Sequence, residues 1–213
     1  MRNKFDMQLD AMNQQLIQMG ELCVKAIANA TSALAEGNPE SAEIVIGEDQ
    51  EIDQMEKNIE HACLKLLLEQ QPVASDLRQI SAALKMITDM ERIGDQAADI
   101  AEIIISAKMT EAKDIKKIQE MASATSRMVR KSIEAFVNKD LEMARKVIED
   151  DDVVDHLFDE VRDELITFIA KSAHQGDVAI DLVMITKYLE RIGDHATNIA
   201  EWVEFSITGV KGE

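Results

Sequence analysis

Apolar side chains recur along this chain with the three- and four-residue spacing of long amphipathic helices. The clearest stripe appears in the middle of the chain and returns near its end, at Met86, Met90, Ile93, Ala97, Ile100 and Ile104, then at Ile185, Leu189, Ile192, Ala196, Ile199 and Val203. This 4-3-4-3-4 spacing is typical of a helix that is packed along its whole length. The pattern therefore predicts helices, and long ones.

Residues that start and stop helices divide the chain into six predicted helices. The predicted bounds are about 4–35, 39–70, 76–106, a fourth helix after Lys113 that reaches Asn138, 141–172 and 178–207. Asn38 and Asp140 are good N-caps, and Pro39 occupies the favoured first helical position. Pro72 interrupts the pattern, and Ser75 is expected to cap the third helix.

A long repeat indicates that the chain is an internal duplication. The twelve residues Glu91 to Glu102 return as Glu190 to Glu201 at an offset of 99, and nine of the twelve are identical. Residues of the preceding helix repeat at an offset of 102, from Val45 to Ile59. We therefore predict an all-α protein of six long helices, arranged as two tandem antiparallel three-helix bundles over residues 1–107 and 108–213.

Composition and charge narrow the class of protein. With 8 Gly, 2 Pro and 3% aromatic residues, the chain lacks the composition of a sheet protein. Its 23 basic and 41 acidic residues give a formal net charge of −18. Such a chain repels phosphate backbones and anionic membranes, so we expect neither nucleic-acid binding nor membrane insertion. Cations, or a basic patch on a partner, suit it better.

The cysteines and the chain start bear on the compartment. Cys23 and Cys63 lie within apolar periodic stretches and form no C-x-x-C pair. We interpret them as buried thiols in a reducing compartment. The sequence has no apolar run of membrane-spanning length, and its first residues do not resemble a signal peptide. A cytoplasmic protein is expected.

Candidate chemistry lies in an acid-x-x-x-Asp pattern that occurs four times. The four pairs are Asp49/Asp53, Glu91/Asp95, Asp151/Asp155 and Glu190/Asp194. If the second and third helices fold back near residue 72, equal rise places Asp49 level with about residue 96 and Asp53 level with about residue 92. The same argument applies to the second half. Four carboxylates are therefore expected to gather in each half.

Carboxylates this close need a counter-charge or good solvation. Three alternatives stay open: solvation, neutralisation by Arg92 and Arg191, or bridging cations. All-oxygen ligands favour hard ions such as Mg²⁺, Mn²⁺, Ca²⁺ or iron. His195 could also ligate a metal, although we interpret it as a surface histidine. Gly94 and Gly193 leave room between the acids for a cluster or another helix.

The two Glu-Arg-Ile-Gly-Asp repeats, with Pro72-Val-Ala-Ser-Asp-Leu-Arg78 ahead of the first, resemble the PhoU family of phosphate-signalling regulators over essentially the whole chain. The resemblance implies cytoplasmic, all-helical and often dimeric proteins without enzymatic activity. It implies multinuclear metal clusters, iron first and zinc, manganese or magnesium next, on the eight acids above. It also implies two partners, the ATPase subunit of the phosphate ABC transporter and the phosphate sensor histidine kinase.

We therefore expect a metal-binding adaptor that links those partners and represses phosphate uptake and the phosphate-starvation response. Two alternatives are a metal-dependent hydrolase and a metal-free helical scaffold whose acids stay solvated. The second half also has Asn198 where the first has Asp99. If Asp99 is a fifth ligand, we expect the second cluster to lack that ligand or to hold it more weakly.

Overall fold

Six long helices make up the chain in the computed structural model, which describes residues 2–70, 72–109, 115–171 and 176–210. The helices are α1 (Arg2–Glu36), α2 (Pro39–Gln70), α3 (Ala74–Ser106), α4 (Lys116–Asn138), α5 (Leu141–Lys171) and α6 (Gly176–Thr208). The all-α prediction is confirmed, and the predicted bounds lie within a few residues of those observed.

Two of the three predicted N-caps are present. Asn38 Oδ1 accepts hydrogen bonds from the backbone N–H groups of Glu40 at 3.0 Å and Ser41 at 3.4 Å. Asp140 Oδ1 accepts one from the N–H of Met143 at 2.9 Å. Each cap thus provides an acceptor for backbone N–H groups of the first turn, which have no partner within the helix.

The predicted cap of α3 at Ser75 is wrong. The helix begins at Ala74, so Ser75 lies inside the first turn, and the N-cap position belongs to Val73. Val73 contributes only its backbone carbonyl, which accepts a hydrogen bond from the N–H of Leu77 at 2.9 Å. From the sequence we also expect a joint between the halves at Lys108–Lys113 and a turn at His174–Asp177. Residues 110–113, 174 and 175 of these segments lie outside the described residues, whereas Gly176 and Asp177 belong to α6.

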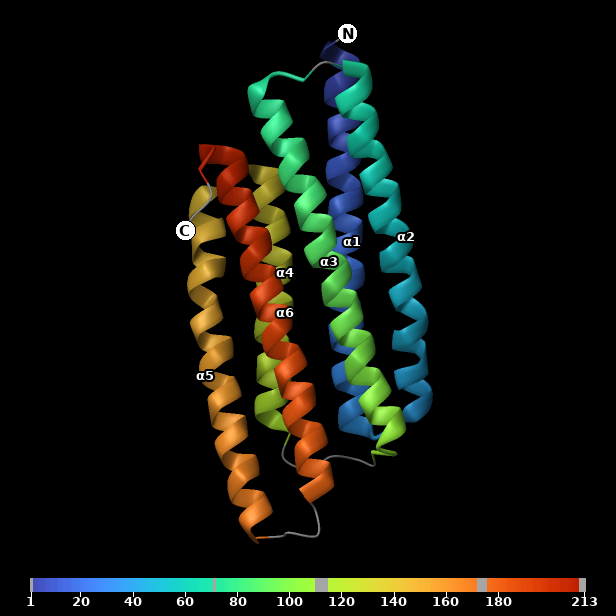
Figure 1. Cartoon of the computed structure of the whole chain (residues 1–213), viewed down its shortest axis with the longest axis vertical. Coiled ribbons are helices and arrows are strands. Elements are labelled where there is room, and N and C mark those ends of the chain that lie inside the picture. The colour runs from blue at the N-terminus through green and yellow to red at the C-terminus, as the bar shows by residue number, and fades with distance from the viewer. Residues whose placement is uncertain (1, 71, 110–114, 172–175, 211–213) are drawn as a thin grey trace.

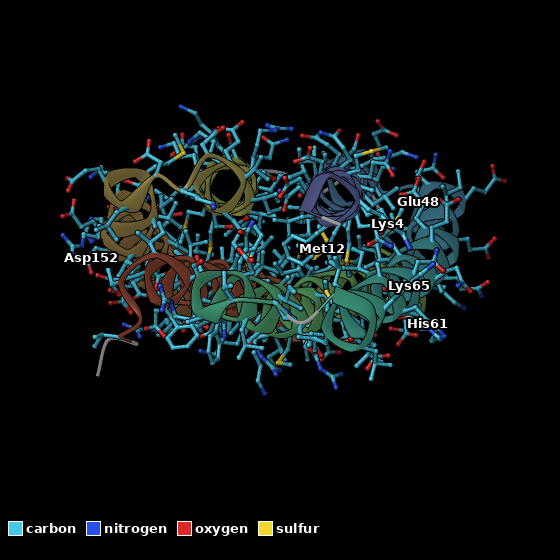
Figure 2. The ribbon with its side chains drawn as sticks, turned by 90° about the horizontal axis from the view of Figure 1, so that it is seen from above. Lys4, Met12, Glu48, His61, Lys65 and Asp152 are labelled. Carbon is cyan, nitrogen blue, oxygen red and sulfur yellow. The ribbon has the colours of Figure 1, made fainter. Side chains whose placement is uncertain are left out.

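The helices form two three-helix bundles that lie side by side (Figure 1). Each helix of the first bundle runs antiparallel to its counterpart in the second. In the first bundle α1, α2 and α3 pack against one another, and in the second α4, α5 and α6 do so. The bundles meet where α3 packs on α6 and α1 packs on α4. Seen from the end, α2 and α5 occupy opposite edges of a flat molecule (Figure 2).

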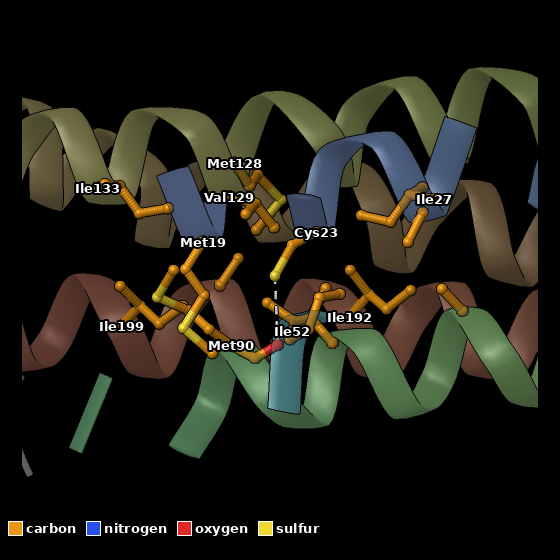
Figure 3. Packing of buried hydrophobic residues seen from close by; sticks show 14 of the residues in the cluster. Met19, Cys23, Ile27, Ile52, Met90, Met128, Val129, Ile133, Ile192 and Ile199 are labelled. Atoms are coloured by element: carbon orange, nitrogen blue, oxygen red, sulfur yellow. Dashed lines mark hydrogen bonds between the residues drawn. The ribbon is translucent and has the colours of Figure 1, made fainter. Parts of the chain in front are cut away.

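A single hydrophobic core runs through both bundles (Figure 3). Every residue of the two predicted stripes is exposed by no more than 1%. Cys23 and Cys63 are buried free thiols, as predicted, and Cys23 Sγ donates to the backbone oxygen of Met90 at 3.3 Å. The helices α1 and α4 approach closely at Gly20, where an added Cβ would overlap Ile133 Cδ1.

In the described ranges, none of the helices is both long enough and apolar enough to cross a bilayer.

Candidate metal centre

The acids of the first half meet where α2 packs on α3. We call the set of Asp49, Asp53, Glu91 and Asp95 the first groove, and the set of Asp151, Asp155, Glu190 and Asp194 the second. Asp49 of α2 lies directly against α3 at Gly94, the residue before Asp95. A Cβ added to Gly94 would be only 2.7 Å from Asp49 Oδ1. The fold-back at residue 72 therefore places Asp49 where equal helical rise predicts it, one residue from Asp95 in height.

The second half repeats this arrangement between α5 and α6. Asp151 lies against Gly193, where an added Cβ would be 2.9 Å from Asp151 Oδ1. Gly193 directly precedes Asp194 on α6. The duplication thus brings acids of two neighbouring helices together in each half of the molecule.

Burial and mutual repulsion raise the pKa of several acids in the first groove. The pKa of Asp49 rises to about 6, first because burial disfavours the charged form and then because Asp95 and Asp53 repel it. Burial, followed by repulsion from Asp95, also raises the pKa of Glu91. The groove therefore holds carboxylates that gain from a nearby positive charge.

The second groove has the same electrostatic character. Burial, then Asp155 and Asp194, raise the pKa of Asp151 to about 6. The pKa values of Asp155 and Asp194 also rise, in both cases first through burial and then through repulsion by Glu190. The four acids of this half therefore lie close enough to raise one another's pKa values.

In each groove a basic residue forms an ion pair with the acids. Arg92 Nη1 lies 2.7 Å from Asp95 Oδ2, and its Nε lies 3.3 Å from Glu91 Oε2. In the second half the partner is Lys187, whose Nζ lies 2.5 Å from Glu190 Oε2. The sequence suggested Arg191 for this role, but Lys187 forms the ion pair with Glu190 on α6.

The acids have the donor chemistry of a hard-cation site, but the site is not preformed. Asp49 Oδ1 and Asp151 Oδ1 are buried oxygens with no hydrogen-bond partner, and all the donors are carboxylate oxygens. Within the described ranges, no three His, Cys, Asp or Glu side chains already converge on one point suited to a metal ion. A cation would require acids to turn away from Arg92 and Lys187.

His195 and Asn198 have a role that sequence reasoning missed. His195 Nδ1 lies 2.9 Å from Asp89 Oδ1, and Asn198 Nδ2 donates to the same oxygen at 3.3 Å. These contacts join α6 to α3 and therefore the two halves. The His195 side chain is only 19% exposed, so the interpretation as a surface histidine is wrong.

The seam between the halves is the set of polar contacts that Asp89, Asp99, Tyr188, His195 and Asn198 make between α3 and α6. Asp99, the counterpart of Asn198, interacts there with the Tyr188 hydroxyl. Asn198 is thus explained by its contact with Asp89 across the seam. The sequence did hold a clue to the seam. The twelve-residue copies differ at three pairs of positions, and two of these pairs, 96/195 and 99/198, contain seam residues.

Taken together, these features define an all-α protein built from two duplicated three-helix bundles, each with an acidic groove between its second and third helices. The family described as the PhoU domain matches the chain twice, over residues 16–104 and 118–203. The chain belongs to the PhoU family.

Named relatives match the chain over nearly its whole length. A phosphate-specific transport system accessory protein PhoU homolog from Clostridium acetobutylicum is 36% identical, covering 98% of this chain and 96% of that protein. One from Pseudomonas aeruginosa is 32% identical, covering 97% of this chain and 86% of that protein.

Solved structures agree with the fold. The crystal structure of PhoU from Pseudomonas aeruginosa superposes with a TM-score of 0.88 at 32% identity, covering 97% of this chain and all of that chain. The phosphate transport system regulatory protein PhoU from Streptococcus pneumoniae gives a TM-score of 0.87 at 26% identity, covering 98% of this chain and 99% of that chain. The predicted pair of three-helix bundles is confirmed.

Proposed function

We propose that this protein is a negative regulator of phosphate uptake and of the phosphate-starvation response. The observation that carries the proposal is the full-length match to relatives named as accessory and regulatory proteins of phosphate transport. In this role the protein acts by binding and not by catalysis. It works in the cytoplasm as a homodimer.

The proposed partners are the ATPase subunit of the phosphate ABC transporter and the phosphate sensor histidine kinase. With a formal net charge of −18, the protein associates best with basic surfaces, and long-range attraction speeds such encounters. An adaptor that binds both partners passes the state of the transporter to the kinase. Weakened binding at high salt is an expected property of these complexes.

The acidic grooves are the proposed metal centres. Asp49, Asp53, Glu91 and Asp95 would hold metal in the first half, and Asp151, Asp155, Glu190 and Asp194 in the second. Iron is the first choice, followed by zinc, manganese and magnesium. Bound cations would supply positive charge that relieves the repulsion among these carboxylates. The positions of these eight acids determine which faces of α2, α3, α5 and α6 would carry the positive charge of the cations.

Binding and genetics test the regulatory role together. The tagged protein is used to capture the transporter ATPase and the kinase, with and without a chelator, and a phosphate-regulated reporter is followed in a deletion strain at high phosphate. The proposal expects both captures, and reporter expression that stays high in the deletion strain. Failure to bind either partner, with a reporter unaffected by deletion, contradicts it.

A metal-free helical scaffold is the second candidate. It is favoured by the ion pairs of Arg92 and Lys187, which already neutralise part of each groove. Elemental analysis of the purified protein separates the two ideas. The metal-centre proposal expects metal in stoichiometric amounts, whereas the scaffold expects none.

A further inference from the structure

The two acidic grooves differ in how they are neutralised. At the offset of 99 that relates α3 to α6, Lys187 corresponds to Thr88. The first groove therefore has no lysine at this position, which is exposed in α3. In the second groove the Lys187 ammonium group lies on Glu190 at 2.5 Å, and it also counteracts the repulsion felt by Asp155 and Asp194.

A second difference reinforces the first. At the offset of 102 that relates α2 to α5, Phe158 corresponds to Glu56. Lys187 Nζ lies 5.3 Å from the centre of the Phe158 ring, within the range of a cation–π contact. Glu56 instead adds a negative charge near Glu91. Phe158 thus contacts the cation of the second groove at a position where the first half has a carboxylate. Asp152 and Asp159, at the positions of Gln50 and Lys57, in turn add negative charge near Asp155.

The basic residues of the two grooves are held by different contacts. Arg92 is 55% exposed, and its two acidic contacts lie on its own helix. Lys187 is 47% exposed, but Phe158 of the neighbouring helix also contacts it, and its partner Glu190 is only 15% exposed. A divalent cation entering the first groove competes with a guanidinium whose two ion pairs lie on α3, whereas in the second groove it competes with an ammonium group that α6 and α5 both contact.

We propose that Lys187 is a built-in counter-cation that competes with a divalent metal ion, so that the two halves bind cations unequally and the first half fills first. This inference rests on the proposed metal centres. It assigns the difference between the halves to Lys187 and Phe158. Asn198 contacts Asp89 in the seam, and it takes the place of Asp99, whose charge also repels Asp49 in the first groove.

Titration of the full chain with Mn²⁺, followed by calorimetry and by the Mn²⁺ electron paramagnetic resonance signal, tests the proposal. The wild type is expected to show a tight and a weak class of site, with Asp95→Asn weakening the tight class and Asp194→Asn the weak one. Lys187→Thr is expected to tighten the weak class by about tenfold, the order for removing one unit charge from a partly solvated site. Thr88→Lys is expected to weaken the tight class.

Two further variants make the comparison specific. Lys116→Thr removes the same charge from the 88% exposed start of α4, and it is expected to change neither class. Lys187→Met keeps an apolar stem over Phe158 while removing the ammonium, so it replaces Lys187→Thr if that variant folds poorly. Circular dichroism establishes folding for each chain before titration.

The outcomes separate the two proposals. If Mn²⁺ binds but Lys187→Thr and Lys187→Met leave both classes unchanged, the role of Lys187 is overturned and the metal centres stand. If neither the wild type nor any variant binds Mn²⁺, both are overturned. Tightening of the weak class alone, without an effect of Lys116→Thr, supports the inference.

Discussion

Gly94 and Gly193 allow a carboxylate of one helix to lie directly against the backbone of the next. At both positions an added Cβ would fall under 3.0 Å from an aspartate oxygen, closer than side chains normally approach. Glycine in a helix costs about 1 kcal/mol relative to alanine. Its use here is therefore explained by the close approach of Asp49 and Asp151.

The variant Gly94→Ala is expected to lower the free energy of unfolding by about 1–3 kcal/mol, because the new methyl group overlaps Asp49 Oδ1 and lies 2.9 Å from Ile52 Cδ1. Gly47→Ala is the matched control, since Gly47 is also helical but has no atom within 4 Å of the added Cβ. It is expected to stabilise by about 0.5–1 kcal/mol. Urea unfolding measures both, and a stabilised Gly94→Ala variant would contradict the proposed packing.

The raised pKa values of Asp49 and Asp151, both about 6, predict a dependence of stability on pH. Both values exceed the ordinary 3.8, so between these limits the folded protein binds more protons than the unfolded chain. The free energy of unfolding contributed by these groups therefore rises as the pH falls from about 7 to about 4.

Urea unfolding at several pH values, in chelator, checks this dependence. The double variant Asp49→Asn/Asp151→Asn is expected to be more stable than the wild type near pH 7, by about 1 kcal/mol per site after allowance for solvent screening. The difference should vanish near pH 4. A difference that stays constant over this range would show that the two carboxyl groups titrate normally.

The helices α3 and α6 each present polar side chains on two faces. One face carries the acids of a groove, and the other forms the seam through Asp89, Asp99, Tyr188, His195 and Asn198. The buried apolar stripe lies between these faces and holds the two helices in the core. A change in a groove therefore occurs on the same rigid helix that contacts the other half.

The seam contact predicts that Asp89→Ala destabilises the protein by about 1 kcal/mol, because His195 and Asn198 both lose their shared partner. Asp10→Ala, an exposed position on α1, serves as the control and is expected to change stability by less than about 0.5 kcal/mol. Chemical denaturation compares the two variants. Equal effects would mean that the seam contact does not stabilise the fold.

The sequence predicted the helices and the meeting of the acids because both follow from regular geometry. The stripes of α3 and α6 set the buried face, and the position of Pro72 set the height at which Asp49 meets Asp95. The sequence did not predict which side of α3 and of α6 faces the other half. Lys187 and Arg191 flank the same acid, and only the packing of α5 and α6 decides which of them pairs with it.

Two bundles with one continuous core make up the whole molecule. Since α3 and α1 of the first bundle pack on α6 and α4 of the second, neither half buries its apolar surface alone. The two sets of acids lie next to α2 and α5, the helices at the two edges of this flat body, where Figure 2 labels Glu48 and Asp152.

The net charge of −18 predicts that salt stabilises the whole molecule. Repulsion among the acidic residues is screened as the ionic strength rises, and the Debye length falls from about 10 Å at 0.1 M to about 3 Å at 1 M. The unfolding temperature is therefore expected to rise between these NaCl concentrations, in chelator and by differential scanning calorimetry. A fall would mean that the attractive ion pairs outweigh this repulsion.

The central claim is that each bundle brings acids of two helices together to hold cations. Anomalous diffraction from crystals of the purified protein, at wavelengths on either side of the absorption edges of iron, manganese and zinc, tests it most directly. The account predicts anomalous peaks in the grooves beside Gly94 and Gly193, within ligand distance of Asp49, Asp95, Asp151 and Asp194. Grooves without such peaks, with Arg92 and Lys187 still paired to their acids in metal-replete crystals, would contradict it.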